Sequence, residues 1–179
     1  MNLRDYERES IRAFVGHAGA NGYLSGRVLD FGCGQQPYRD LVAAAGGEYI
    51  PFDRAHFPGN VSGEDVGGEP WPYTDYDTIL CTQVIQYVDY PADILRAFKL
   101  RGKVLVMTYP TTWAEVEAAD RWRFTKAGMT WMLEQAGFAI LLHERRGTLY
   151  DARFPAGREK RITALSDEFA IGYGVVARA

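Results

Sequence analysis

The amino-acid sequence predicts an α/β fold, with a mostly parallel sheet covered by helices on both faces. Short apolar runs alternate with amphipathic segments along the chain, which is typical of parallel strands joined by crossing helices. The chain has 179 residues, 47% of them hydrophobic and 24% charged. This is enough for one buried core and too short for two ordinary domains. We therefore expect residues 1–179 to form a single domain.

The N-terminal segment is predicted to be an amphipathic helix. One of its sides carries the apolar residues Ile11, Phe14, Val15 and Ala18. Arginines occupy another side, and glycines at positions 19 and 22 are expected to end the helix. The helix should therefore pack on the rest of the domain by its apolar side.

The next elements are a strand, a helix and a second strand. An apolar run over residues 28–31 breaks into a Gly-Cys-Gly turn, which is the pattern of a buried parallel strand that ends sharply. A helix is expected over residues 37–45, closed by a glycine. A second short strand is expected over residues 49–52, with Asp53 at its carboxyl end.

The remaining elements follow the same alternation. Strands are expected over residues 78–81, 104–108, 138–142 and 168–177, and helices over residues 91–98 and 125–136. Parallel sheets bind ligands beyond the carboxyl ends of their strands. Four residues close or follow such strands, namely Gly32, Asp53, Cys81 and Tyr109. This edge of the sheet is therefore expected to hold the functional site.

The charge of the chain argues against nucleic acid as a partner, because a formal net charge of −3 would repel a polyanion. Basic residues gather late in the chain, at Arg145, Arg146, Arg153, Arg158, Lys160 and Arg161. We interpret this run as solvated loop charge, with an anion-binding surface as the alternative. An acidic or phosphorylated substrate therefore stays open.

The two cysteines, Cys33 and Cys81, lie in apolar runs, which favours reduced thiols over a disulfide scaffold or a zinc cluster. The first ten residues are charged, unlike those of a signal peptide. No apolar run reaches the roughly 18 residues that span a bilayer. We expect a cytoplasmic protein with no membrane partner and no bound metal.

Asp53 gives the glycine turn a functional interpretation. A glycine turn alone is often an ordinary link between a strand and a helix. A carboxylate at the end of the next strand, however, can accept hydrogen bonds from both hydroxyls of a ribose. We favour this role over that of a solvated loop carboxylate. The two glycines of the turn, Gly32 and Gly34, would leave backbone room for the ligand.

Pro37 separates this turn from the dinucleotide-binding fingerprint. That fingerprint needs a third glycine for close packing and a free helix N-terminus for a pyrophosphate. Proline suits the first turn of a helix but brings a ring to the position of that glycine. A nucleoside ligand without a pyrophosphate therefore fits better than a nicotinamide or flavin cofactor.

The run Val28-Leu-Asp-Phe-Gly-Cys-Gly34 resembles the first motif of the class I S-adenosylmethionine-dependent methyltransferases. Residues 65–72, 76–88, 123–129 and 133–138 are similar to later stretches of that family, in its order and at its spacing. The likeness covers about residues 29–138. It implies a single Rossmann-like domain of the small type 11-like kind, with a mostly parallel seven-stranded sheet and an antiparallel last strand.

The resemblance implies S-adenosylmethionine as the cofactor. Asp30 and the glycine turn would meet its methionine part, and Asp53 would hold its ribose. Asp65 would contact the adenine, and Gln83 would lie beside the sulfonium. The full set of implied contacts is Asp30, Phe31, Gly32, Cys33, Gly34, Phe52, Asp53, Arg54, Asp65 and Gln83.

Methyl transfer from a sulfonium is an in-line displacement, so positioning of the nucleophile supplies most of the catalysis and a base is optional. His56, Tyr87 and Tyr109 are the candidate bases, each with a packing or loop role as the alternative. Tyr87 stands where many relatives carry a histidine, which leaves the substrate side undetermined. His17 and His143 are interpreted as structural residues.

These observations predict a methyltransferase that acts on an oxygen or nitrogen atom of a small-molecule acceptor. The acceptor is expected among the N-terminal helix, Tyr87, Tyr109 and residues 113–123, in a monomer or homodimer. One alternative is a relative that binds the cofactor or a partner protein without turnover. A second and weaker alternative is a nicotinamide-dependent oxidoreductase.

Overall fold

The fold was analysed in a computed structural model that describes residues 3–53, 75–112, 119–147 and 170–179. In chain order the elements are α1 (Leu3–Ala20), β1 (Gly26–Phe31), α2 (Arg39–Ala44), β2 (Gly47–Phe52), β3 (Tyr76–Thr82), the 3-10 helix η1 (Ile85–Tyr87), α3 (Pro91–Arg101), β4 (Gly102–Pro110), α4 (Lys126–Gln135), β5 (Ala139–Arg145) and β6 (Gly172–Arg178). The predicted alternation of strands and helices is confirmed.

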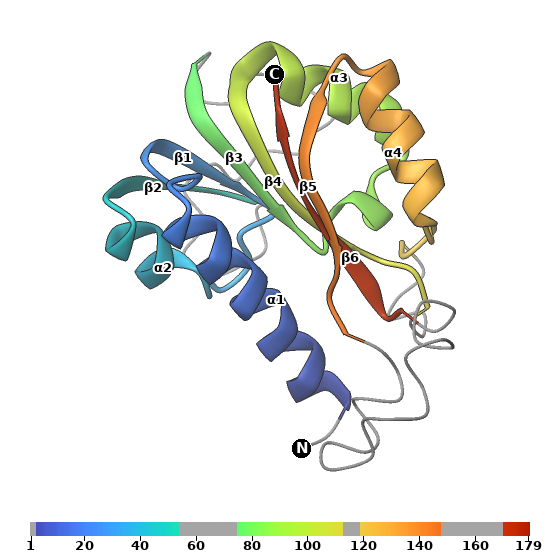
Figure 1. The fold of residues 1–179 in the computed structure, drawn as a ribbon, viewed down its shortest axis with the longest axis horizontal. Helices are drawn as coiled ribbons and strands as arrows, with labels where there is room; N and C mark the ends of the chain where they lie inside the picture. The colour runs from blue at the N-terminus through green and yellow to red at the C-terminus, as the bar shows by residue number, and fades with distance from the viewer. Residues whose placement is uncertain (1–2, 54–74, 113–118, 148–169) are drawn as a thin grey trace.

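The strands form one sheet in the order β2-β1-β3-β4-β6-β5 (Figure 1). β1 is parallel to both β2 and β3, and β3 is parallel to β4. β6 is antiparallel to its neighbours β4 and β5, so the last strand alone runs against the rest. The predicted fold class is therefore confirmed. The described residues contain six strands, whereas seven were predicted.

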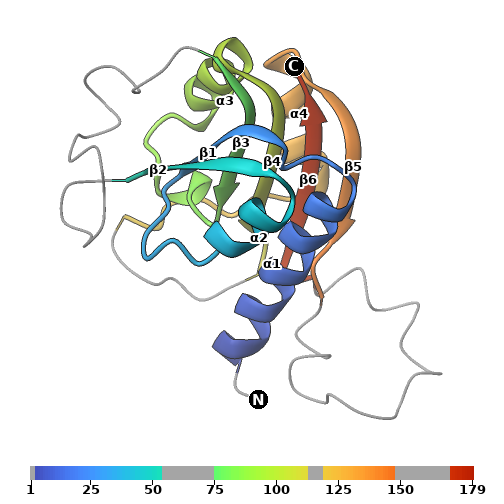
Figure 2. The ribbon, with the colours of Figure 1, turned by 90° about the vertical axis from the view of Figure 1, so that its left-hand side faces the viewer.

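Helices cover both faces of the sheet, with α1 and α2 on one face and α3 and α4 on the other (Figures 1 and 2). Alternate residues of each strand point to opposite faces. Leu80 thus belongs to the core beneath α1 and α2, while its neighbours Ile79 and Cys81 belong to the core beneath α3 and α4. This double burial explains why the central strands are apolar at nearly every position.

The sequence signals at the helix ends act as predicted. The Thr125 hydroxyl accepts a hydrogen bond from the Gly128 N–H at 3.0 Å, so it caps α4. The apolar side of α1, from Ile11 to Ala18, is buried against the sheet. None of the helices in the described parts of the chain is long and apolar enough to cross a membrane.

The sheet order reverses at β1, because β2 lies on one side of it and β3 on the other. In open α/β sheets, the connections leave in opposite directions at such a point and open a crevice outside the carboxyl ends. The glycine turn after β1, Asp53 after β2 and Gln83 after β3 all follow strands at this point. The fold therefore brings these three of the expected site positions to one edge of the sheet.

Candidate active site

The turn after β1 is tied to the end of β2. The N–H groups of Gly32 and Cys33 both donate to the Phe52 carbonyl, at 2.8 and 3.1 Å. The next residue after Phe52 is Asp53, whose Oδ2 accepts a hydrogen bond from the Gly34 N–H at 2.6 Å. Asp53 is 9% exposed. The structure therefore holds this carboxylate against the glycine turn, and not in a solvated loop.

The two glycines of the turn have different reasons to be glycine. Gly32 has a φ of +78°, and a Cβ there would lie 2.2 Å from Cγ2 of Val84. Gly34 has a φ of +49°, and a Cβ there would have no atom within 4 Å. Both conformations favour glycine. The expected room for a ligand therefore exists at Gly34, whereas Val84 fills the corresponding space at Gly32.

Asp30 lies inside the sheet beside this turn and is fully buried. Its Oδ2 accepts a hydrogen bond from the Tyr49 hydroxyl at 2.5 Å. Its Oδ1 has no hydrogen-bond partner among the residues that the structure describes. Burial raises the pKa of Asp30 to about 7. A buried acceptor without a donor is unusual and indicates a place where a ligand can supply one.

Gln83 follows β3 with a φ of +54°, a conformation that non-glycine residues rarely adopt. Its N–H donates to the Thr108 carbonyl at 3.1 Å, and its side-chain amide contacts the Thr108 hydroxyl at 3.4 Å. Such backbone conformations gather at functional sites, where neighbouring contacts hold them in place. Gln83 and the end of β4 are thereby fixed side by side.

Three of the expected cofactor residues have buried side chains. The rings of Phe31 and Phe52 stack with centroids 5.4 Å apart, inside the core beneath α3 and α4. Cys33 is also buried, and this burial raises the pKa of its thiol to about 12. These residues would meet a ligand by their backbone. Arg54, His56 and Asp65 lie outside the described residues.

Tyr109 is a fully buried residue of β4. Its hydroxyl lies 2.6 Å from Nε2 of His143, and Nδ1 of His143 lies 3.1 Å from the Thr130 hydroxyl. The rings of Tyr109 and Tyr173 stack at 5.9 Å. Burial raises the pKa of the Tyr109 hydroxyl. These contacts favour the packing role of Tyr109 over that of a base, and they agree with a structural role for His143.

Tyr87 lies in η1 and is partly buried. Its carbonyl accepts a hydrogen bond from the Arg121 guanidinium at 3.2 Å, which ties η1 to the segment after β4. In the same segment Asp120 is buried and forms an ion pair with Arg123 at 2.5 Å. Trp122 donates its indole N–H to the Val88 carbonyl at 2.8 Å. Residues 113–118 lie outside the described residues.

Sequence reasoning was wrong about Arg146, which was interpreted as solvated loop charge. Arg146 is only 4% exposed. Its guanidinium reaches the Ser10 hydroxyl at 3.2 Å and the carbonyls of Tyr173 and Tyr109 at 3.2 and 3.4 Å. Burial lowers its pKa to about 10. No local pattern distinguishes Arg146 from its exposed neighbour Arg145, because only the packing of α1 over the strand ends buries it.

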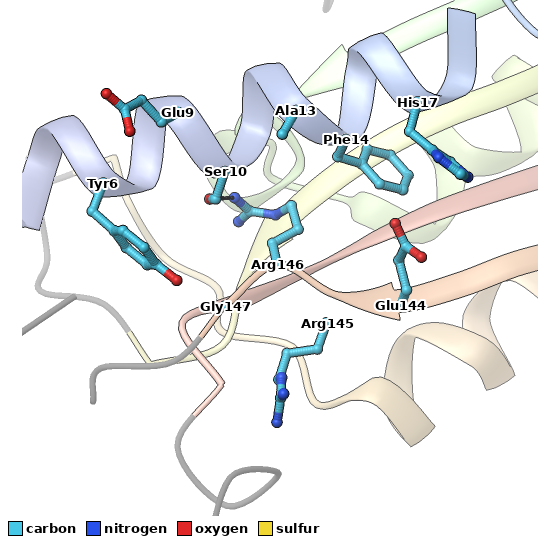
Figure 3. A pocket seen from close by; sticks show the side chains of 10 residues that line it. All are labelled: Tyr6, Glu9, Ser10, Ala13, Phe14, His17, Glu144, Arg145, Arg146 and Gly147. Atoms are coloured by element: carbon cyan, nitrogen blue, oxygen red, sulfur yellow. Dashed lines mark hydrogen bonds between the residues drawn. The ribbon is translucent and has the colours of Figure 1, made fainter. Parts of the chain in front are cut away.

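A groove of about 440 Å³ lies between α1 and the end of β5 (Figure 3). Its lining residues are Tyr6, Glu9, Ser10, Ala13, Phe14, His17, Glu144, Arg145, Arg146 and Gly147. Both carboxylates and guanidinium groups line it, so the groove has no single sign of charge. Within the described ranges, no group of His, Cys, Asp and Glu side chains could hold a metal ion.

Comparison with solved structures identifies proteins of the same fold. A SAM-dependent methyltransferase from Archaeoglobus fulgidus has 17% identity and a TM-score of 0.67, and the match covers 96% of this chain and 94% of that chain. A magnesium protoporphyrin IX methyltransferase from Synechocystis with bound SAM has 16% identity and a TM-score of 0.65, covering 99% and 81%. The [4+2]-cyclase SpnF has 16% identity and a TM-score of 0.54, covering 91% and 79%.

At these identities the structural likeness shows the fold. A comparison with curated proteins gave no match. The sequence itself matches the family described as "Methyltransferase domain" over residues 3–143, which is most of the chain. S-adenosylmethionine is the cofactor that this family and fold indicate. The chain therefore belongs to the methyltransferase-domain family, with the class I S-adenosylmethionine-dependent fold that its sequence predicted.

Proposed function

We propose that this protein transfers a methyl group from S-adenosylmethionine to an oxygen or nitrogen atom of a small-molecule acceptor. The observation that carries the proposal is the contact between Asp53 and the N–H of Gly34 at the point where the sheet order reverses. It puts a carboxylate beside a glycine turn that has open space, which is the arrangement that a nucleoside ligand requires.

The residues present fit this cofactor. The open space at Gly34 admits a ligand against the backbone, and the unpartnered Oδ1 of Asp30 can accept an N–H from its amino-acid part. Asp53 would hold the ribose hydroxyls, and Gln83 would lie beside the sulfonium. Arg54 and Asp65 remain in the proposed set on the strength of the sequence resemblance alone.

S-adenosylmethionine supplies an electrophilic methyl group on a sulfonium, so the protein needs mainly to position the nucleophile and exclude water. Residues 121–124 lie at the strand ends through backbone hydrogen bonds to Gln86 and Pro110. The first half of α1 lies near the end of β4, since Arg146 joins Ser10 to the Tyr109 carbonyl. Both segments would surround the acceptor. If a base is used, His56 and Tyr87 are the proposed candidates. Tyr109 is the weakest candidate because its hydroxyl contacts His143.

One alternative is a protein of the same fold that does not transfer a methyl group. One solved structure of this fold is described as a [4+2]-cyclase and not as a methyltransferase. A chain that binds S-adenosylmethionine without turnover would have the same turn and the same Asp53. The cofactor and the reaction therefore need separate measurements.

The test is a calorimetric titration with S-adenosylmethionine, S-adenosylhomocysteine and NAD, followed by incubation with methyl-labelled S-adenosylmethionine and a metabolite extract. We expect both sulfur nucleosides to bind, NAD not to bind, and label to pass to a small molecule. Binding without transfer of label would support the non-catalytic alternative. Binding of NAD alone would contradict the proposal.

A further inference from the structure

Arg146 is the buried cation that the proposed cofactor site does not use. Its side chain leaves the end of β5, passes the Tyr173 carbonyl of β6 and reaches the Tyr109 carbonyl of β4. A third contact, to the Ser10 hydroxyl, joins it to α1. Figure 3 shows the guanidinium directed toward Ser10, with α1 above it. The cation therefore lies under α1, over the end of β4.

The three contacts leave the charge of Arg146 poorly compensated. All three acceptors are neutral oxygens, at 3.2 to 3.4 Å, whereas charge-assisted hydrogen bonds are about 2.7 to 2.9 Å long. A guanidinium has five N–H groups, so two have no acceptor within the described part of the chain. No carboxylate of the described residues forms an ion pair with Arg146.

The carboxyl group whose charge acts on Arg146 is that of Glu7, one turn before Ser10 on α1. The Glu7 carboxyl acts on Arg146 through its field, without an ion pair within the described residues. Burial raises the pKa of Glu7 itself. A buried cation normally has a hydrogen-bonded anion, because desolvation of an unpaired charge is unfavourable. Glu7 and Arg146 therefore interact through their charges, with no ion pair between them within the described residues.

The position of Arg146 relates it to the proposed reaction. Its bond to the Tyr109 carbonyl places the guanidinium near the carboxyl end of β4, the strand that pairs with β3. Arg146 and Ser10 also line the groove between α1 and β5, so the buried guanidinium forms part of the groove wall (Figure 3). The cation thus lies between an open groove and the edge where the methyl group would be transferred.

We propose that Arg146 binds a carboxylate of the methyl acceptor and thereby selects acidic small molecules. The inference rests on the proposed function, since it names the substrate class of the same site. A carboxylate can take two parallel hydrogen bonds from a guanidinium. A single negative charge matches Arg146, whereas a phosphate dianion would add a charge that Glu7 opposes. The carboxylate anchors the acceptor, and the atom that receives the methyl group lies elsewhere on it.

The test measures the binding of benzoate, benzamide and phenyl phosphate to the full chain saturated with S-adenosylhomocysteine, by NMR titration. We expect benzoate to bind at least about tenfold more tightly than benzamide or phenyl phosphate. Arg146→Lys should weaken benzoate binding about tenfold, because an ammonium lacks the planar fork. Arg96→Lys is the matched control, since Arg96 is an exposed arginine of α3, on the other face of the sheet from α1, and it should change binding by less than about twofold.

A second variant, Glu7→Gln, tests the inference even if Arg146→Lys does not fold. Removal of a like charge beside the anion should tighten benzoate binding by about threefold or more, whereas a purely structural Arg146 would give no change. Equal binding of benzoate and benzamide, tighter binding of phenyl phosphate, or unchanged benzoate binding in Glu7→Gln would each overturn the inference. If the wild-type chain does not bind S-adenosylhomocysteine, the proposed function is contradicted. Titration of benzoate in the absence of S-adenosylhomocysteine would then still test Arg146.

Discussion

Asp53 contacts the glycine turn and, in the proposed function, the ribose. Asp53→Ala should weaken S-adenosylhomocysteine binding by at least about tenfold, because each hydrogen bond to a charged group is worth roughly 1.5–3 kcal/mol. Asp53→Asn is the matched control, since its amide oxygen can still accept from the Gly34 N–H. We expect the asparagine variant to lie between wild type and alanine in calorimetry. If all three proteins bind S-adenosylhomocysteine with equal affinity, the proposed contact between Asp53 and the ribose is contradicted.

Tyr109 tests whether a buried hydroxyl serves packing or chemistry. Tyr109→Phe leaves Nε2 of His143 without its partner, which should lower the free energy of unfolding by roughly 1–3 kcal/mol. Cofactor affinity and the rate of methyl transfer should not change. Urea unfolding and single-turnover kinetics on the same sample check this. A slower rate of methyl transfer with an unchanged free energy of unfolding would support a role for Tyr109 in the reaction.

At the residue scale, some positions in the site could be predicted from the sequence and others could not. The position of Asp53 beside the glycine turn could be predicted, because it depends on the place of Asp53 after a strand, which the sequence itself encodes. The bond between Tyr49 and Asp30 joins two strands, and the burial of Arg146 needs three more elements to assemble around it. Neither follows from spacing along the chain, because both arise from the packing of distant segments.

Among the secondary-structure elements, α1 divides into two halves with different roles. Its buried apolar residues begin at Ile11, whereas Ser10 in the first half contacts Arg146 and the charge of Glu7 acts on it. Deletion of residues 1–10 should therefore impair methyl transfer more than folding. We expect a cooperative unfolding transition to remain and the rate of methyl transfer to fall by at least about tenfold. A truncated chain that unfolds, or one that retains full turnover, would contradict this division.

Element boundaries were predicted to within a few residues where turn chemistry is local. Thr125 before α4 and the glycine after it are such cases. The helix expected over residues 37–45 spans Arg39–Ala44 in the structure. Tyr38 is not part of it, because its backbone has φ −114° and ψ 3°, outside the helical region. The 3-10 helix Ile85–Tyr87 was not predicted, since three residues carry no periodic signal.

For the whole molecule, the buried Asp30 and the partly buried His143 give opposite contributions to the pH dependence of stability. The pKa of Asp30 is raised from 3.8 to about 7, so its contribution is present below pH 3.8 and is lost as the pH rises through 7. The pKa of His143 is lowered from 6.5 to about 4, so its contribution is present above pH 6.5 and is lost as the pH falls through 4.

Comparison of wild type with Asp30→Asn isolates the first contribution, because both proteins keep His143. The stability of wild type relative to Asp30→Asn should fall by a few kcal/mol between pH 4 and pH 7.5 in urea unfolding. A constant difference across this range would mean that Asp30 keeps its ordinary pKa in the folded chain.

The whole account depends on where the cofactor binds. A crystal structure of the chain with S-adenosylhomocysteine tests this most directly. We predict that the ribose hydroxyls lie within hydrogen-bond distance of Asp53 and that the amino-acid part lies against Gly34, beside Asp30. Density for the ligand in the groove between α1 and β5, or its absence from the edge formed by β1, β2 and β3, would contradict the account.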